Sequence, residues 1–165
     1  MQNGEWCPLP YHNAPWYSSA MKKCVFCTQP DIQKRVVAKN DLAFAFPTNI
    51  PITPGHTLIA PLRCAATFDE LTDRELYALF ALRKKIAVTL ARVFGAEGFN
   101  FAWNEGEAAG QTIPHLHLHI VPRRRGDKGS LGYDPRKFLY RPGSREPSPE
   151  RELQTIAEEI RKHLG

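Results

Sequence analysis

Residues 115–121 read HLHLHIV and hold three of the six histidines of this 165-residue chain, each separated from the next by one aliphatic residue. In an extended strand, successive side chains point to opposite faces. The spacing predicts a strand whose histidines share one face, while the other residues, Leu116, Leu118 and Ile120, enter a core. Such a row of imidazoles can be a metal site, a nucleophile flanked by helper groups, or an accident of composition on an exposed strand.

Three further strand-like runs predict an antiparallel sheet around the histidine strand. The runs at residues 35–47 and 56–63 are joined by TNIPITPG, whose prolines and glycine mark a connection. Residues 99–104, FNFAWN, alternate like a strand, and EGEAAGQT then turns the chain into the run at 113–122. Strands that follow one another through short connections pair most simply in antiparallel fashion.

Two helices are predicted, one between the strand pairs and one at the C-terminus. Thr72 is placed to cap the first, with Glu75 three residues on, and Gly95 ends it. Its apolar residues recur at helical spacing: Leu79, Leu82, Ile86, Leu90 and Val93. The second opens at Ser148 and has the apolar stripe Leu153, Ile156, Ile160 and Leu164. The element order indicates an α+β fold, in which an antiparallel sheet is backed by one long helix.

Composition is typical of a soluble globular protein. Hydrophobic residues make up 42% and charged residues 24%, and no run of about 18 apolar residues could cross a membrane. The start of the chain, MQNGEWCPLP, lacks the basic and apolar regions of an export signal, so the expected location is cytoplasmic. Thiols stay reduced there, which leaves the four cysteines free, catalytic or metal-bound.

The net charge of +5 and the pI near 9.1 favour an anionic partner, which could be nucleic acid, a phosphorylated small molecule or an acidic surface. Much of the excess lies in PRRRGDK, directly after the histidines. The connection before them adds Asn104, Gln111 and Thr112 as donors, and glycines such as Gly110 that let backbone N–H groups approach an anion. Both segments could bind phosphate, or they could be a solvated loop and an ordinary turn.

The segment GQTIPHLHLHIVPRRRGD, residues 110–127, resembles the signature of the histidine triad (HIT) superfamily, and PITPGHTLIAPLRC, residues 51–64, is similar to the other recognisable block of that family. GEAAGQT and VPRRRGD look closest to the Fhit-like hydrolases of dinucleoside polyphosphates and their bacterial relatives. The resemblance implies a HIT domain at 24–127, whose antiparallel sheet would have about five strands. An irregular N-terminal arm at 1–23 would precede it, and a basic loop and C-terminal helix at 128–165 would pack on it.

The resemblance also implies a covalent mechanism. His117 would be the nucleophile that attacks the α-phosphate and holds the nucleotide as a nucleotidyl-histidine, which water then hydrolyses. His119 would bind the phosphate and assist the leaving group, and Gln111 and Thr112 would donate to phosphoryl oxygens. His56 matches a position that supports the triad, although a buried structural histidine explains it equally well.

The same resemblance suggests the substrate pocket. Asn104 matches a polar position near the scissile phosphate, and Gly110 would lie beside the bound phosphate. Thr48 stands where the family usually has an aspartate or asparagine that binds the ribose hydroxyls, so either Asn49 substitutes or ribose selectivity is loosened. An apolar adenine pocket would include Phe26 and Phe46, and core packing explains these aromatic residues just as well.

Cys24 and Cys27 form a C-x₂-C pair suited to one tetrahedral zinc ion. In many bacterial relatives, a P-K-x-H segment and the first histidine of the triad complete the site, and here that segment reads PLRC. The resemblance therefore implies a structural zinc site of Cys24, Cys27, Cys64 and His115. The alternative is three reduced, buried thiols.

These features predict a nucleotide hydrolase or nucleotidyltransferase that acts on adenine dinucleoside polyphosphates such as Ap₄A and Ap₃A. An adenosine phosphoramidase and an Ap₄A phosphorylase are alternatives, because they share the same intermediate. A metal-dependent hydrolase is disfavoured, since the neighbouring strands lack an acidic residue at ligand spacing. A non-catalytic nucleotide or nucleic-acid binding module is the remaining class, with nucleic acid the less expected partner. The family also implies a homodimer that extends the sheet.

Overall fold

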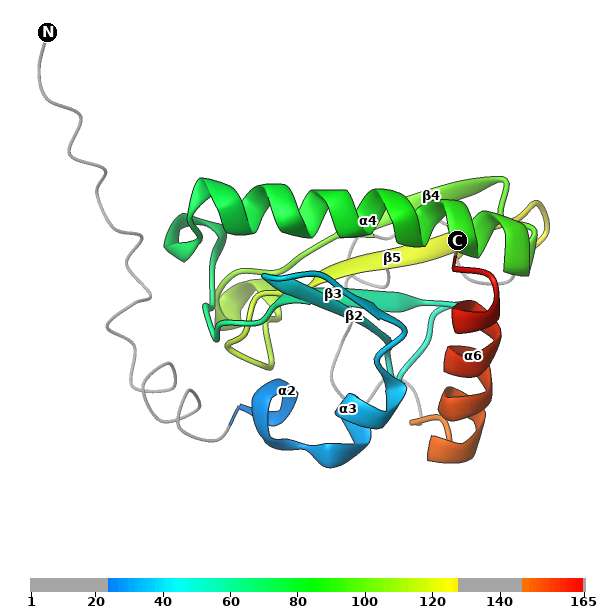
Figure 1. Cartoon of the computed structure of the whole chain (residues 1–165), viewed down its shortest axis with the longest axis horizontal. Coiled ribbons are helices and arrows are strands. Elements are labelled where there is room, and N and C mark those ends of the chain that lie inside the picture. Colours follow the sequence, from blue (N-terminus) through cyan, green and yellow to red (C-terminus); the bar gives the residue numbers. More distant parts are fainter. Residues whose placement is uncertain (1–23, 128–146, 165) are drawn as a thin grey trace, which may run out of the picture.

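A five-stranded antiparallel sheet forms the centre of the computed structural model, which describes residues 24–127 and 147–164 (Figure 1). The strand order is β1-β2-β3-β5-β4. The strands are β1 Ala38–Lys39, β2 Ala43–Pro47, β3 Thr57–Pro61, β4 Gly98–Ala102 and β5 Leu118–Arg123. The predicted fold class and antiparallel pairing are confirmed. The predictions for 1–23 and 128–146 lie outside the described residues.

The long helix α4, Asp73–Phe94, lies along one face of the sheet, and local sequence explains both of its ends (Figure 1). The hydroxyl of Thr72 accepts the N–H of Glu75 at 3.3 Å, while the Glu75 carboxylate accepts the N–H of Thr72 at 2.9 Å. This reciprocal pair is a capping box. Gly95 ends the helix with a φ of 61°, in the left-handed region that favours glycine. The predicted helix is confirmed.

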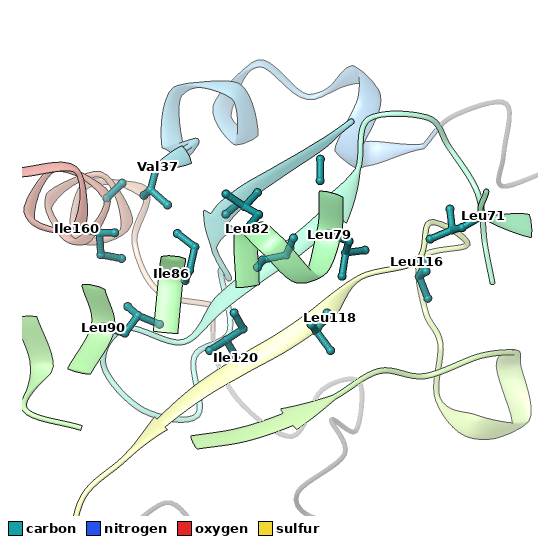
Figure 2. Packing of buried hydrophobic residues seen from close by; sticks show 14 of the residues in the cluster. Val37, Leu71, Leu79, Leu82, Ile86, Leu90, Leu116, Leu118, Ile120 and Ile160 are labelled. Atoms are coloured by element: carbon teal, nitrogen blue, oxygen red, sulfur yellow. The ribbon is translucent and has the colours of Figure 1, made fainter. Parts of the chain in front are cut away.

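Two hydrophobic clusters cover the two faces of the sheet. The cluster beneath α4 joins that helix to the histidine segment and includes Leu79, Leu82, Ile86, Leu90, Leu116, Leu118 and Ile120 (Figure 2). Two short helices, α2 Val25–Thr28 and α3 Pro30–Arg35, cover the opposite face. That second cluster includes Phe26, Ile32, Phe44, Phe46 and Leu58. Alternate residues of β2 enter the two clusters, so this strand is buried on both faces.

The C-terminal helix α6, Glu150–Lys162, packs beside α3 and α4. Leu153 and Ile160 of the predicted stripe are buried, together with Ala157. The predicted opening at Ser148 is wrong, because Pro149 occupies the N-cap position and makes no side-chain cap. The N–H of Ser148 instead donates to the carbonyl of Asn49 at 2.7 Å, which ties the start of α6 to the connection after β2.

The predicted strand at 35–47 is wrong as a single element. Arg35 is the last residue of α3, and β1 has only two residues. The chain then turns because Oδ1 of Asn40 accepts the N–H groups of Leu42 and Ala43, at 3.1 and 2.8 Å. The helices α2 and α3 were not predicted, since four and six residues are too few to show a helical period.

Two 3₁₀ helices, η2 Phe68–Glu70 and η3 Glu107–Ala109, lie in connections. The second belongs to the glycine-rich connection between β4 and β5, just before the histidine segment. In the part of the chain that the structure describes, no helix has the length and apolar character needed to cross a membrane.

Candidate active site

The histidine segment alternates as predicted, but only part of it belongs to a strand. β5 begins at Leu118, so His119 is the only triad histidine within it, which corrects the prediction of one strand for all three. The preceding residues pair elsewhere, because the N–H of Leu116 donates to the carbonyl of Ala65 at 2.6 Å. Leu116 still enters the core beneath α4, and the ring of His117 lies against the aromatic residues of the opposite cluster.

His117 is held as a neutral imidazole by its backbone neighbour. Its Nδ1 lies 2.7 Å from the carbonyl oxygen of His115, which can only accept, so Nδ1 carries the hydrogen. The lone pair is then on Nε2. Burial lowers the pKa of His117 to about 4, so the ring is uncharged at neutral pH. A neutral imidazole with a lone pair on one fixed nitrogen can act as a nucleophile.

A second hydrogen-bond chain sets the tautomer of His119. The N–H of Ile52 donates to Nδ1 of His56 at 3.1 Å, so the hydrogen of a neutral His56 is on Nε2. That nitrogen lies 2.9 Å from Nδ1 of His119 and donates to it, which leaves the hydrogen of a neutral His119 on Nε2. The ring centroids of His117 and His119 are 5.0 Å apart. The site thus places a lone-pair nitrogen beside an N–H donor.

A cavity of about 270 Å³ lies at these rings, bounded by the sheet and by helices α2 and α3. Most of the predicted site residues line it, namely Phe26, Phe46, Thr48, Asn49, His56, Asn104, Gly110, Thr112, His117 and His119. The rings of Phe26 and Phe46 meet edge to face with centroids 5.1 Å apart, and both belong to the second hydrophobic cluster. These two rings therefore serve the core and the cavity wall together.

Thr48 and Asn49 reach the cavity from the connection after β2. Thr48 is buried, and its hydroxyl accepts the N–H of Ile50 at 3.4 Å. The backbone of Asn49 is anchored by Ser148, as described above. The position expected to contact ribose therefore offers a hydroxyl and an amide in place of a carboxylate.

Gln111 does not line the cavity, although its neighbours do. The residue is buried, its Oε1 accepts the N–H of Gly106 at 2.7 Å, and its Nε2 donates to the carbonyl of Ala66 at 2.8 Å. Asn104 donates to the carbonyl of Gly110 at 3.5 Å. The amide of Gln111 thus holds the glycine-rich connection in shape, and the expected donation to a phosphoryl oxygen has no support in this geometry.

Among the cavity residues that the sequence predictions missed, Arg35 is the charged one. Its side chain is 8% exposed, and its Nε lies 3.5 Å from Oε1 of Glu150 in α6. The sequence held a signal for the position of Arg35, because it follows the apolar Ile32 by three residues, a spacing that puts both on one side of a helix. Assigning residues 35–47 to a strand concealed it.

Cys24, Cys27, Cys64 and His115 meet in one cluster, as the zinc prediction requires. Their ligand atoms all lie within 4.8 Å of one another. Tetrahedral zinc with bonds of about 2.3 Å to sulfur places its ligand atoms roughly 3.8 Å apart, so small movements suffice. Nε2 of His115 donates to the carbonyl of Pro61 at 2.8 Å, so a neutral ring has its lone pair on Nδ1. This Nδ1 lies 3.2 Å from Sγ of Cys24 and 3.6 Å from Sγ of Cys27.

The thiols of this cluster favour a bound cation electrostatically. A hydrogen bond from Cys64 lowers the pKa of Cys24 to about 3, and His115 adds to the effect. The same hydrogen bond, with burial, raises the pKa of Cys64 above its usual range. At least one thiolate is therefore present at neutral pH, and thiolate sulfur and imidazole nitrogen are donors that zinc prefers. The carbonyl of His115 also holds Nδ1 of His117, so the cluster adjoins the candidate nucleophile.

The sequence pattern of the HIT domain matches residues 29–126. The chain belongs to the HIT domain family. This HIT chain is similar to bis(5'-adenosyl)-triphosphatase of Dictyostelium discoideum, with 30% identity over 131 residues that cover 78% of this chain and 85% of the relative. It is also similar to the asymmetrical bis(5'-nucleosyl)-tetraphosphatase of Schizosaccharomyces pombe, with 36% identity over 107 residues. That match covers 65% of this chain and 59% of the relative.

Solved structures agree with this assignment. The HIT chain is similar to a zinc-bound histidine triad family protein from Mycobacterium smegmatis, with a TM-score of 0.67 and 28% identity. The similarity covers 87% of this chain and 94% of the other. The HIT resemblance and the fold that it implies are therefore confirmed.

Proposed function

We propose that this HIT protein hydrolyses dinucleoside polyphosphates of the Ap₄A or Ap₃A kind through a covalent nucleotidyl-histidine on His117. One observation carries the proposal. Nε2 of His117 has a lone pair, Nε2 of His119 has a hydrogen, and both residues line one cavity. The relatives named as bis(5'-adenosyl)-triphosphatase and bis(5'-nucleosyl)-tetraphosphatase support the substrate class.

The reaction has two steps. In the first, Nε2 of His117 attacks the α-phosphorus, the bond from phosphorus to the bridging oxygen breaks, and the polyphosphate part leaves with the electron pair. His119 donates from Nε2 to the oxygen that gains charge, and Thr112 is a further donor at the cavity. In the second step, water attacks phosphorus and the P–N bond breaks. The mononucleotide then leaves, the proton of the water passes to solvent, and His117 regains its lone pair.

The chain of hydrogen bonds through His56 favours phosphoanhydrides over phosphoramidates. Because His56 donates to Nδ1 of His119, a neutral His119 donates from Nε2. A phosphate leaving group, whose last pKa is about 6, departs as an anion without taking that proton. An amine leaving group has to gain a proton, and a neutral imidazole is too weak an acid to supply it.

Replacing His117 with alanine tests the mechanism. We expect hydrolysis of Ap₃A and Ap₄A to fall by at least about a thousandfold while nucleotide binding persists, because the covalent route is removed. Undiminished turnover would contradict the mechanism. A panel of Ap₃A, Ap₄A and adenosine phosphoramidate, with and without phosphate, then separates a hydrolase from a phosphoramidase and a phosphorylase by the products formed.

A structural zinc ion held by Cys24, Cys27, Cys64 and His115 is part of the proposal. The close approach of the four ligand atoms supports it, as does the zinc-bound relative from Mycobacterium smegmatis. Zinc there would fix the backbone at His115 and supply no chemistry to the cavity. Reduced thiols also suit the predicted cytoplasmic location, which stays a prediction.

A nucleic-acid binding module is the competing class, and the basic stretch after the histidines does not favour it. Arg123 forms an ion pair with Asp127. Nε of Arg125 lies 3.8 Å from Oε2 of Glu97. These partners offset part of the positive charge that first suggested a polyanion. A small anionic ligand at the cavity therefore explains the site better than a nucleic-acid surface does.

We also propose a homodimer that forms along β4. This strand lies at one edge of the described sheet and can pair with a second copy. Beside it, the ring of Phe68 contacts Trp103 and Phe80, with centroids 4.9 and 6.4 Å apart. Trp103 and Phe80 are 47% and 49% exposed. An edge strand next to half-exposed aromatic rings is a surface that a partner subunit would cover.

A further inference from the structure

Arg35 lines the cavity and carries two buried hydrogen-bond donors without a partner. The residue is 6% exposed. Within residues 24–127 and 147–164, its Nε and Nη1 are the only buried side-chain nitrogen or oxygen atoms without a hydrogen-bond partner. Because buried donors in folded proteins are nearly always paired, such a pair on a residue that lines a cavity points to an acceptor on a ligand.

The charge of Arg35 is compensated, whereas its hydrogen-bonding capacity is not. Nε lies 3.5 Å from Oε1 of Glu150, an ion pair whose geometry leaves Nε without a hydrogen bond. Since Glu150 already offsets the positive charge, this end of the cavity has no strong attraction for a second phosphate. A neutral group with oxygen or nitrogen acceptors suits it better.

Apolar side chains lead from the candidate nucleophile toward Arg35. The ring of Phe26 lies 5.2 Å from that of His117, and Phe26 packs in one cluster with Ile32 and Phe46. Arg35 follows Ile32 by about one turn of α3, and all of these residues line the cavity. Flat aromatic and aliphatic surfaces of this kind accept a nucleobase by stacking. Arg35 therefore lies where a base edge would be read.

Guanidinium groups have only donors, and purine bases differ in what they offer them. Guanine and hypoxanthine present O6 and N7 as two neighbouring acceptors that one arginine can bind together, whereas adenine presents an amino donor beside N7. We propose that Arg35 reads the base of the nucleotide bound at His117 and selects 6-oxopurines over adenine. The proposal rests on the proposed function in taking the cavity as a nucleotide site, and it predicts that dinucleoside polyphosphates containing guanosine or inosine are better substrates than Ap₄A and Ap₃A.

Mononucleotide binding to the wild-type protein tests the preference for 6-oxopurines without any substitution. By isothermal titration calorimetry, GMP and IMP should have dissociation constants at least about fivefold below that of AMP. 7-Deaza-GMP, which lacks the N7 acceptor, should bind more weakly than GMP. Equal constants for GMP and AMP overturn the proposal, and so does undiminished binding of 7-deaza-GMP.

Two variants separate base reading from support of α6. Arg35→Met keeps an unbranched side chain in the wall and removes the donors, so the preference for GMP over AMP should disappear. Glu150→Gln is the matched control, because it breaks the same ion pair and leaves the guanidinium in place, so the preference should persist. Loss of the preference in both variants overturns the proposal, since the contact with α6 would then be its cause. If Arg35→Met does not fold, the titrations of GMP, IMP, AMP and 7-deaza-GMP into the wild-type protein still test the proposal.

Turnover of Gp₄G and Ap₄A distinguishes this inference from the function on which it rests. A higher kcat/KM for Gp₄G that Arg35→Met abolishes supports both. Cleavage of the two substrates at equal rates, with equal GMP and AMP affinity, overturns the role of Arg35 and leaves the hydrolase intact. Absence of cleavage together with an Arg35-dependent GMP preference removes the hydrolase and supports the base-reading role.

Discussion

Each triad histidine has its own hydrogen-bond partner, and that partner sets what the ring can do. His115 donates to the carbonyl of Pro61 and turns Nδ1 toward the cysteines. His117 donates to the carbonyl of His115, and His119 accepts from His56. The hydrogen of a neutral imidazole goes to the nitrogen that faces an acceptor, so three identical side chains acquire three different chemistries.

Replacing His56 tests whether it positions His119. We expect His56→Phe to lower kcat for Ap₄A on the order of tenfold to a hundredfold with little change in KM, because the tautomer of His119 is no longer imposed. His56→Gln is the matched variant, since its amide can both accept from Ile52 and donate to His119, and it should recover part of kcat. Equal losses in the two variants, measured by steady-state kinetics, would mean that His56 acts only through packing.

Cys64 tests the metal site one ligand at a time. We expect purified wild-type protein to contain zinc by elemental analysis, and Cys64→Ala to contain much less. Cys64→His keeps a zinc ligand and should retain the metal. Because the carbonyl of His115 holds His117, loss of zinc should also lower kcat more than nucleotide affinity. Equal zinc content in Cys64→Ala and the wild type would remove Cys64 from the ligand set.

At the scale of single elements, α4 shows how far local sequence reaches. Its cap is completed by Arg63, which donates to the Glu75 carboxylate from Nε at 2.9 Å and from Nη2 at 2.8 Å. The hydrogen bonds from Arg63, followed by those of Thr72, lower the pKa of Glu75 to about 2. The spacing of Thr72 and Glu75 predicted the capping box. The contact with Arg63 was not predictable from spacing, because Arg63 lies in the segment after β3 and reaches Glu75 only in the folded chain.

Glu75→Gln should therefore lower the free energy of unfolding by about 1–2 kcal/mol at pH 7. A carboxyl whose pKa is depressed in the folded state stabilises the protein above its unfolded pKa of about 4.3, and this stabilisation is lost as the pH falls toward 2. The difference between wild type and variant in urea unfolding should shrink accordingly. Glu97→Gln is the control, because its ion pair with Arg125 is exposed and should change stability by less than about 0.5 kcal/mol.

Elements that depend on distant partners were harder to predict than α4. β5 starts at Leu118, later than predicted, since the N–H of Leu116 donates to the carbonyl of Ala65 in the connection after β3. The run at 35–47 contains a helix end, a two-residue strand and a turn at Asn40. Its strand-like composition holds for β1 and β2, but composition alone does not separate short elements of different kinds.

For the whole molecule, the edge at β4 predicts the oligomeric state. We expect sedimentation velocity to show a dimer for the wild type and a monomer for Trp103→Glu, because a charge would be buried beside the paired strands. Val88→Glu, at a site on α4 that is 58% exposed and outside the aromatic cluster, should leave the dimer unchanged. A monomeric wild type, or dissociation in both variants, would contradict pairing along β4.

The candidate site itself was largely predictable, with two instructive exceptions. The predicted metal ligands form one cluster, and the predicted cavity residues gather around His117 and His119. Gln111 does not line the cavity, because both ends of its amide are hydrogen-bonded to the backbone of Gly106 and Ala66. Arg35 enters because α3 turns it into the cavity. Which backbone groups reach a side chain is a property of packing, and residue type alone does not reveal it.

The amino-acid sequence by itself determined what depends on neighbours along the chain: the capped helix α4, the alternation that sends Leu116, Leu118 and Ile120 into the core, and the C-x₂-C half of the cysteine cluster. Only the tertiary structure decided which nitrogen of each histidine carries a hydrogen, because Pro61 and Ile52 come from other segments. It also decided that Arg35 borders the cavity. Covalent neighbours impose local geometry, whereas hydrogen positions and cavity walls follow from contacts that exist only after the chain has folded.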